Sequence, residues 1–170
     1  KNQKNNKIMK NIFIFILFVL ISLSGPIYLC SLNKKICYIK SSADSLRIIS
    51  SDIKYKSMPL FEIIDNISNT FNLYYYKKLS NKNSFSNFEN DWINIINNDE
   101  YLDIESKKIL IQVGNIIGKT NSSRQYKLLN KYADDLEKIY FERKQELRKK
   151  SKIYNSSGIL FGLFVVIIFM

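Results

Sequence analysis

The sequence predicts an all-α protein, in which a helical bundle is flanked by an apolar helix at each end. Apolar residues concentrate in two blocks, 12–32 and 153–170, and the stretch between them is strongly charged. Within that stretch, apolar residues recur three and four positions apart, which is the period of an amphipathic helix. Its roughly 110 residues are enough to bury a modest single core.

The first apolar block follows a polar tail at residues 1–11, in which Met9 is the expected true start of the protein. Residues 12–32 are long enough to span about 30 Å of hydrocarbon as a transmembrane helix. Pro26 would kink this helix, which membrane-spanning helices tolerate. A cleaved secretory signal peptide is the alternative, because it too has a charged start, an apolar run and small residues.

The soluble bundle is expected at residues 42–152. Its first helix is predicted by a stripe of Leu46, Ile49 and Ile53. Pro59 marks the start of a second helix. The apolar face of that helix consists of Leu60, Ile63, Ile64 and Ile67. The polar composition of residues 80–84 predicts a loop.

An aromatic stripe at helical spacing follows this loop, and we interpret it as core packing rather than as a base-stacking surface. It consists of Phe85, Phe88, Trp92, Ile95 and Ile96. Asp103 is a suitable cap for the next helix. The buried face of that helix is expected to carry Leu110, Val113 and Ile117.

Two glycines, Gly114 and Gly118, stand four residues apart and therefore on one helix face. The missing side chains would let another helix approach closely. Gly118 can also adopt the left-handed conformation that ends a helix. The alternative is that Gly118 is only a cap and that Gly114 has no packing role.

The last helix is expected to run from Ser123 to the end of the chain, because its apolar spacing continues without glycine or proline to Asn155. It then enters the apolar block 153–170, which we interpret as a second transmembrane helix. A single helix of about 48 residues would be about 70 Å long. Gln125, one turn into this helix, either bonds to the preceding turn or faces water.

The chain has no histidine, which excludes several classes of site. Imidazole is the usual general base near neutral pH and the commonest metal ligand. Cys30 and Cys37 cannot form a zinc tetrad alone, and we interpret them as small apolar filler. Four carboxylates are the remaining catalytic candidates, and their scattered spacing predicts no convergent pair: Glu62, Asp65, Asp91 and Glu105. We therefore expect no enzyme activity, no metal and no cofactor.

The net charge of +11 raises the question of nucleic-acid binding, since clustered Lys and Arg neutralise phosphates. However, the densest basic run, 143–152, directly precedes an apolar block, where cations meet lipid headgroups. The middle of the chain also lacks the glycine and aromatic pattern of an RNA-binding sheet. The lipid bilayer is the expected partner of this charge, and nucleic acid is not.

The C-terminal third resembles the family of stage III sporulation protein AB. The resemblance rests on Val113-Gly114-Asn115-Ile116-Ile117-Gly118, a short polar turn, Gln125, a long charged helix and the apolar ending. It extends upstream to Met9 through Pro59-Leu60 with Glu62 and through Trp92. The family usually has an aspartate near the position of Asn121, and asparagine can still cap a helix there.

The resemblance implies a bundle like the F domain of type II secretion platforms. It also implies a structural membrane component of a secretion-like or channel complex between mother cell and forespore, acting as a docking platform. The implied partners are other stage III membrane proteins and a cytoplasmic ATPase-like subunit, and homo-oligomers are compatible with this role. The alternative function is a membrane-tethered adaptor that binds anionic lipid or a partner helix through its basic stem.

The charge distribution predicts the orientation, because positive residues beside spanning segments stay in the cytoplasm. The bundle side of the two segments carries the larger positive charge, from Lys34, Lys35, Lys40, Arg143, Lys144, Arg148, Lys149, Lys150 and Lys152. The soluble domain is therefore expected in the cytoplasm. The resemblance implies that the membrane is the mother-cell membrane around the forespore.

Overall fold

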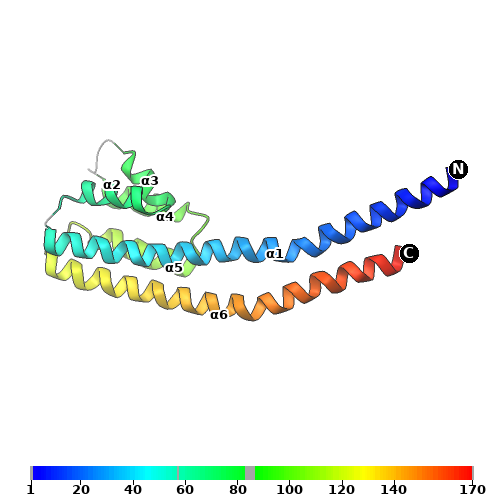
Figure 1. The fold of residues 1–170 in the computed structure, drawn as a ribbon. Coiled ribbons are helices and arrows are strands. Elements are labelled where there is room, and N and C mark those ends of the chain that lie inside the picture. The colour runs from blue at the N-terminus through cyan, green and yellow to red at the C-terminus, as the bar shows by residue number, and fades with distance from the viewer. Residues whose placement is uncertain (1, 57, 83–86, 170) are drawn as a thin grey trace. The chain divides into compact units, whose positions relative to one another are not determined.

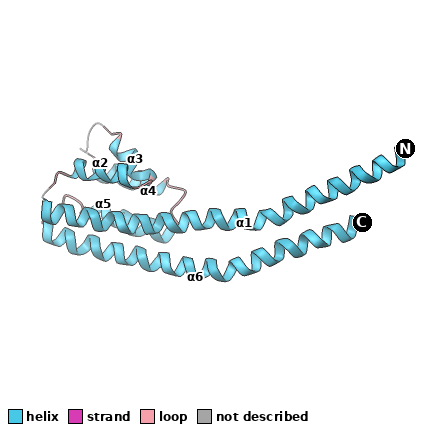
Figure 2. Cartoon of the chain, in the orientation of Figure 1, coloured by secondary structure: helices cyan, strands magenta, loops and turns pink. Residues whose placement is uncertain are grey.

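The computed structural model describes residues 2–56, 58–82 and 87–169, and within the two end segments only some of the side chains. Throughout these residues the regular structure is helical and contains no strand (Figures 1 and 2), which confirms the predicted all-α bundle. The elements in chain order are α1 (Asn2–Ser51), the π-helix η1 (Asp52–Lys56), α2 (Leu60–Thr70), α3 (Tyr74–Ser80), α4 (Phe88–Asn97), α5 (Ile104–Ile116) and α6 (Ser122–Phe169).

The chain divides into two compact units. Unit 1 contains residues 1–34 and 144–170, and unit 2 is the continuous segment Lys35–Arg143. Unit 2 is shifted toward the N-terminus relative to the expected bundle at 42–152. The buried side chains account for the shift, because the core face of α1 already begins at Ile36 and that of α6 ends at Ile139.

Within unit 2, the C-terminal part of α1 and the N-terminal part of α6 run antiparallel and side by side (Figure 1). As residue numbers rise along α1 and η1, those of their partners fall along α6: Lys40 contacts Glu137, Arg47 contacts Asp134, Ser50 contacts Asn130, and Tyr55 in η1 contacts Tyr126. We call this contact line the α1–α6 seam.

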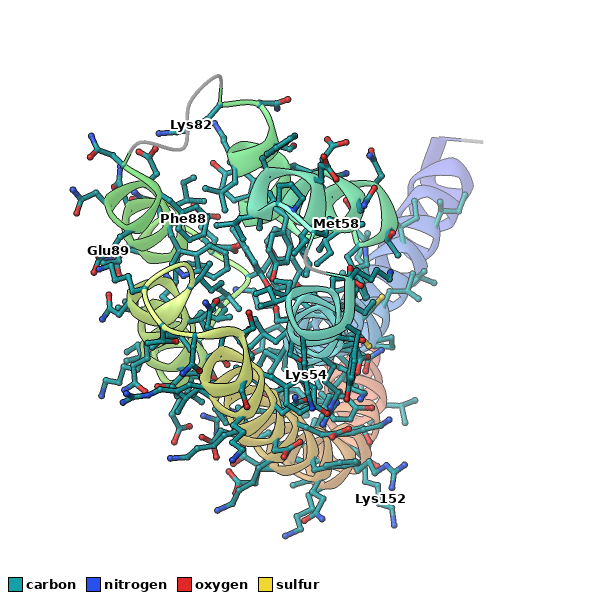
Figure 3. All side chains as sticks on the ribbon, turned by 90° about the vertical axis from the view of Figure 1, so that its left-hand side faces the viewer. Lys54, Met58, Lys82, Phe88, Glu89 and Lys152 are labelled. Atoms are coloured by element: carbon teal, nitrogen blue, oxygen red, sulfur yellow. The ribbon has the colours of Figure 1, made fainter. Side chains whose placement is uncertain are left out.

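The core of unit 2 is built around Trp92, which is fully buried on α4. Its ring centroid lies 5.5 Å from that of Tyr75, 5.8 Å from that of Tyr76 and 5.6 Å from that of Phe88. Figure 3 shows side chains filling the space between the helices of this unit. The aromatic stripe is therefore core packing, as predicted, although Phe85 lies outside the described residues.

Helix α3 was not expected from the sequence, which indicated one helix from Pro59 and then a loop at 80–84. In the structure α2 ends at Thr70, and α3 places the side chains of Tyr75 and Tyr76 in the core. The start of α3 depends on a distant residue, because the backbone N–H of Tyr74 donates to the Tyr38 hydroxyl at 2.8 Å.

The two end segments belong to the long helices. α1 is continuous from the predicted tail at 1–11 through Pro26 into unit 2, and α6 is the single helix of 48 residues that the sequence predicts. Many side chains of the predicted spans 12–32 and 153–170 lie outside the described residues. Among the described residues, no helix combines the length and the apolar character needed to cross a membrane.

Candidate functional site

Two of the predicted site residues, Trp92 and Gly114, meet at the crossing of α4 and α5. A Cβ atom at Gly114 would lie 2.4 Å from Cδ1 of Trp92, much closer than two carbon atoms can approach. The Trp92 indole N–H also donates to the Leu110 carbonyl at 2.6 Å, one turn earlier on α5. Gly114 is thus the point at which α5 accommodates the indole ring, and this is the close approach that the sequence predicts.

Gly118 has a different role from Gly114. Its φ of +77° lies in the left-handed region, and no heavy atom lies within 4 Å of its Cβ position. The sequence allows Gly118 to serve either close helix packing or a left-handed helix end, and the structure shows the helix end. The interpretation that both glycines serve one packed face is wrong for Gly118, because α5 has already ended at Ile116.

Gln125 and Asn121 connect this turn to α6. The Gln125 side chain is buried, accepts a hydrogen bond from the Gly118 N–H at 3.2 Å and donates to the Thr120 carbonyl. Asn121 Oδ1 accepts from the Arg124 N–H at 2.8 Å, so the asparagine caps the helix. The question that the sequence left open is settled, because Gln125 bonds to the turn.

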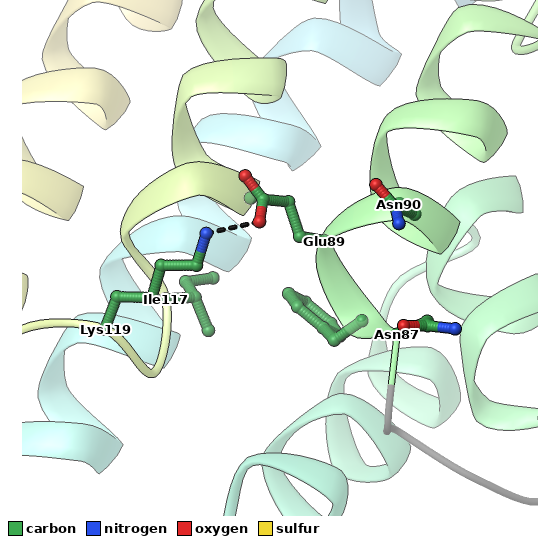
Figure 4. Close-up of a pocket in the computed structure, with 7 residues that line it drawn as sticks. Asn87, Glu89, Asn90, Ile117 and Lys119 are labelled. Atoms are coloured by element: carbon green, nitrogen blue, oxygen red, sulfur yellow. Dashed lines mark hydrogen bonds and ion pairs between the residues drawn. The ribbon is translucent and has the colours of Figure 1, made fainter.

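A pocket of about 230 Å³ opens beside this crossing (Figure 4). It is lined by Asn87, Phe88, Glu89, Asn90, Gly114, Ile117 and Lys119. The Lys119 ammonium forms an ion pair with the Glu89 carboxylate, which links the turn after α5 to α4. The opposite charges of this pair neutralise each other. The pocket therefore offers the amide groups of Asn87 and Asn90 for hydrogen bonds and the ring of Phe88 for apolar contact, but no uncompensated charge.

Pro59 lies at the start of α2 and does not line this pocket. Its φ of −58° suits a helix start, and its carbonyl accepts hydrogen bonds from the N–H groups of Glu62 and Ile63 at 3.1 and 3.2 Å. Pro59 therefore begins a helix, as predicted.

A buried polar cluster joins three parts of unit 2 and was missed by the sequence reasoning. The Tyr38 hydroxyl on α1 donates to Asp99 Oδ2 at 2.6 Å, and the N–H of Tyr101 donates to Asp99 Oδ1 at 2.8 Å. Burial and the hydrogen bond to Asp99 raise the pKa of Tyr38 far above its usual value. Asp99 is only 1% exposed, although it lies in a polar sequence that gives no sign of burial.

Ion pairs line the middle of the α1–α6 seam. The Glu137 carboxylate forms ion pairs with the Lys40 ammonium at 2.7 Å and with the Arg47 guanidinium at 2.5 Å. The Arg47 guanidinium also pairs with the Asp134 carboxylate at 2.8 Å. The hydrogen bonds from Lys40 and Arg47 lower the pKa of Glu137 below its usual range. This arrangement holds two helices together, and we call it the charge ladder.

The structure does not bring the four candidate acids together. Asp91 pairs with Lys82, Glu105 pairs with Arg143 at 2.8 Å, and the other two are on α2: Glu62 is exposed there, and so is Asp65. In the part of the chain that the structure describes, no three His, Cys, Asp or Glu side chains are grouped as metal ligands.

The two cysteines do not match their interpretation as packed filler. Cys30 and Cys37 are free thiols and are exposed on α1. The position of Cys37 explains its exposure, because the core face of α1 carries the neighbouring Ile36 and Ile39.

The family model of stage III sporulation protein AB matches residues 10–170. The chain belongs to this family. The match includes the α4–α5 crossing, the Gly118 turn and both end segments, so it confirms the resemblance seen in the sequence. No curated protein and no solved structure matches the chain. Membership of the stage III sporulation protein AB family supports a role in sporulation.

Proposed function

We propose that this protein is a structural membrane component of a sporulation complex between mother cell and forespore, in which unit 2 is a docking platform. Residues 12–32 and 153–170 serve as transmembrane helices that anchor it. Family membership supports the sporulation part of this proposal.

The observation that carries the membrane part is the exposure of large apolar side chains along the two end segments. On α1 the described side chains of this kind are 50–67% exposed: Ile12, Ile16, Leu20, Leu23 and Ile27. On α6, Leu160, Leu163, Phe164 and Ile167 are also exposed. Each exposed apolar Å² costs about 25 cal/mol in water, and such patches mark membrane or protein contacts.

A docking role is favoured over catalysis by the character of unit 2. Its four candidate catalytic acids are dispersed, and in the pocket beside Gly114 the charges of Glu89 and Lys119 neutralise each other. The proposed partners are other stage III membrane proteins, a cytoplasmic ATPase-like subunit and further copies of the chain.

A membrane-tethered adaptor is the second candidate, and the basic stem favours it. Four cations lie directly before Ile153: Arg148, Lys149, Lys150 and Lys152. Such a cluster attracts anionic headgroups, at about 1 kcal/mol per cation near the surface.

Cysteine labelling in intact sporulating cells tests the anchored, cytoplasmic arrangement. Cys30 and Cys37 are replaced by serine, and Asn81→Cys places one thiol at an exposed position after α3. A membrane-impermeant maleimide should label this thiol only after lysis, and Glu100→Cys should behave in the same way. Labelling of both positions in intact cells would place the domain outside, and the docking proposal would fail.

A further inference from the structure

A group of tyrosines and lysines lies at the end of unit 2 where η1 follows α1 and α6 begins. The exposed Lys54 and Tyr55 contact the half-buried Tyr126, and Lys127 and Lys131 follow on α6 with exposed side chains; we call these five residues the Lys54 surface. Figure 3 is viewed from this end and labels Lys54. The Lys54 ammonium lies 4.0 Å from the ring centroid of Tyr126 and 4.8 Å from that of Tyr55. The two rings are 6.0 Å apart and nearly perpendicular, so they hold the ammonium in a defined place.

The backbone beneath this surface is unusual. η1 is a π-helix, a rare conformation that occurs frequently at functional sites. It is anchored by the buried Asp52, whose carboxylate pairs with Lys56 at 2.8 Å. This anchored turn presents Tyr55 to solvent, 67% exposed, outside the core of the bundle.

The positive charge of the surface is uncompensated, in contrast to the rest of the α1–α6 seam. In the middle of the seam, both Lys40 and Arg47 have carboxylate partners. At the Lys54 surface, none of the three lysines pairs with a carboxylate of the described part of the chain. Lys127 and Lys131 are one turn apart on α6, so their charges lie on one face.

We propose that the Lys54 surface binds an acidic segment of a partner protein, whose carboxylates meet the three lysines while an apolar side chain packs on Tyr55. The proposal rests on the docking function above and names its surface. Aromatic residues are enriched at the centres of protein interfaces, where ordered side chains give up little entropy on binding.

Two other anionic partners, a bilayer and a nucleic acid, are possible for such a charge, and both are outcomes of the test below. A nucleic-acid strand would require cations along its backbone, whereas this group is compact.

The test uses the full-length protein in nanodiscs of neutral lipid and a fluorescent oligoglutamate peptide. The double variant Lys127→Glu/Lys131→Glu places like charge against the peptide and should weaken binding about tenfold or more. Tyr55→Ala should weaken it several-fold, because it removes one wall of the Lys54 site. Lys138→Glu is the matched control, since Lys138 is exposed on the same helix seven residues beyond Lys131. It should change the affinity less than about twofold.

Three results would overturn the proposal. The first is that Lys138→Glu weakens peptide binding as much as the double variant does, which would indicate that the peptide is attracted only by the net charge of the protein. The second is unchanged affinity in the double variant and in Tyr55→Ala. The third is that single-stranded DNA or anionic vesicles bind more tightly than the oligoglutamate peptide, and that the same variants abolish this binding. Circular dichroism of each variant checks that the bundle is intact.

Spore counts separate this proposal from the docking function itself. The double variant should lower the number of heat-resistant spores while Lys138→Glu does not, and the thiol at Asn81→Cys should remain protected in intact cells. Protected thiol with normal sporulation of the double variant would reject the Lys54 surface alone. A thiol labelled in intact cells would reject the docking function, whatever the peptide affinities are.

Discussion

At the scale of single residues, two glycines four positions apart in the sequence have different structural roles. Gly114 is required by space, because the buried Trp92 ring occupies the volume of a side chain. Gly118 is required by conformation, because its φ is +77° and its surroundings are open. Substitutions can therefore distinguish the two residues.

Gly114→Leu should destabilise unit 2 by about 1–3 kcal/mol, because a branched side chain must displace a packed indole. Thermal unfolding of the full chain in detergent, followed by circular dichroism, measures the change. Asn115→Leu is the control, since Asn115 is exposed on the same helix and should stay within about 0.5 kcal/mol. A Gly114→Leu variant more stable than the wild type would show that the crossing is not tight.

Gly118→Ala should cost about 1–2 kcal/mol, because an L-residue is strained in the left-handed region. Gly118→Asn should cost less, since asparagine enters this region more readily. The melting temperatures of the two variants give the order. Equal stability of all three proteins would contradict a left-handed turn.

At the scale of elements, the Tyr38–Asp99 cluster fixes how α1, α3 and the loop after α4 meet. One hydroxyl satisfies the Asp99 carboxylate and the first N–H of α3 at the same time. Buried polar groups are costly when they lose a partner, so this small cluster specifies a single arrangement of the elements.

Tyr38→Phe should destabilise unit 2 by about 1–3 kcal/mol, because Asp99 and the Tyr74 N–H each lose a hydrogen bond. Tyr74→Phe is the matched control, since only the backbone of Tyr74 takes part in the cluster. Urea unfolding of both variants measures the difference. Equal midpoints would show that the cluster does not hold α3 in place.

At the scale of the whole molecule, two long helices connect the two units, and within unit 2 the charge ladder holds them in register. On the solvent side of the seam the two helices are joined by the ion pairs of the ladder, whose side chains Lys40, Arg47 and Glu137 remain partly exposed. Pairs of this kind are individually weak, and a network with close geometry contributes more than an isolated pair. Its contribution depends on pH.

Lys40 and Arg47 lower the pKa of Glu137 below the usual 4.5. A carboxylate whose pKa is lower in the folded state stabilises the fold at pH values above its unfolded-state pKa. This stabilisation is lost as the pH falls through the lowered folded-state pKa. The unfolding midpoint should therefore decrease below about pH 4.5, and Glu137→Gln should remove about 1 kcal/mol or less at neutral pH.

The pH dependence should flatten in Glu137→Gln but not vanish. Asp103 adds to it, because burial opposes its ionisation but hydrogen bonds from Ser106 and Arg143 outweigh burial and lower its pKa. An unaltered pH profile in Glu137→Gln would show that the ladder contributes nothing to stability.

Local features were predictable from the sequence, because each depends on residues within about one helical turn. The amphipathic stripes, the Asp103 and Asn121 caps, the start at Pro59 and the continuous last helix all belong to this class. The family resemblance was also readable, since it rests on a contiguous motif around Gly114 and Gly118.

The sequence by itself determined that the chain is helical, where α2, α5 and α6 begin, and which faces are apolar. Only the tertiary structure decided that Gly114 receives Trp92, that α3 is a separate helix and that Glu137 serves two cations. The physical reason is separation along the chain: Tyr38 and Asp99 are 61 residues apart, and Lys40 and Glu137 are 97 residues apart. Periodicity reports neighbours on one helix, whereas these partners become neighbours only when the helices pack.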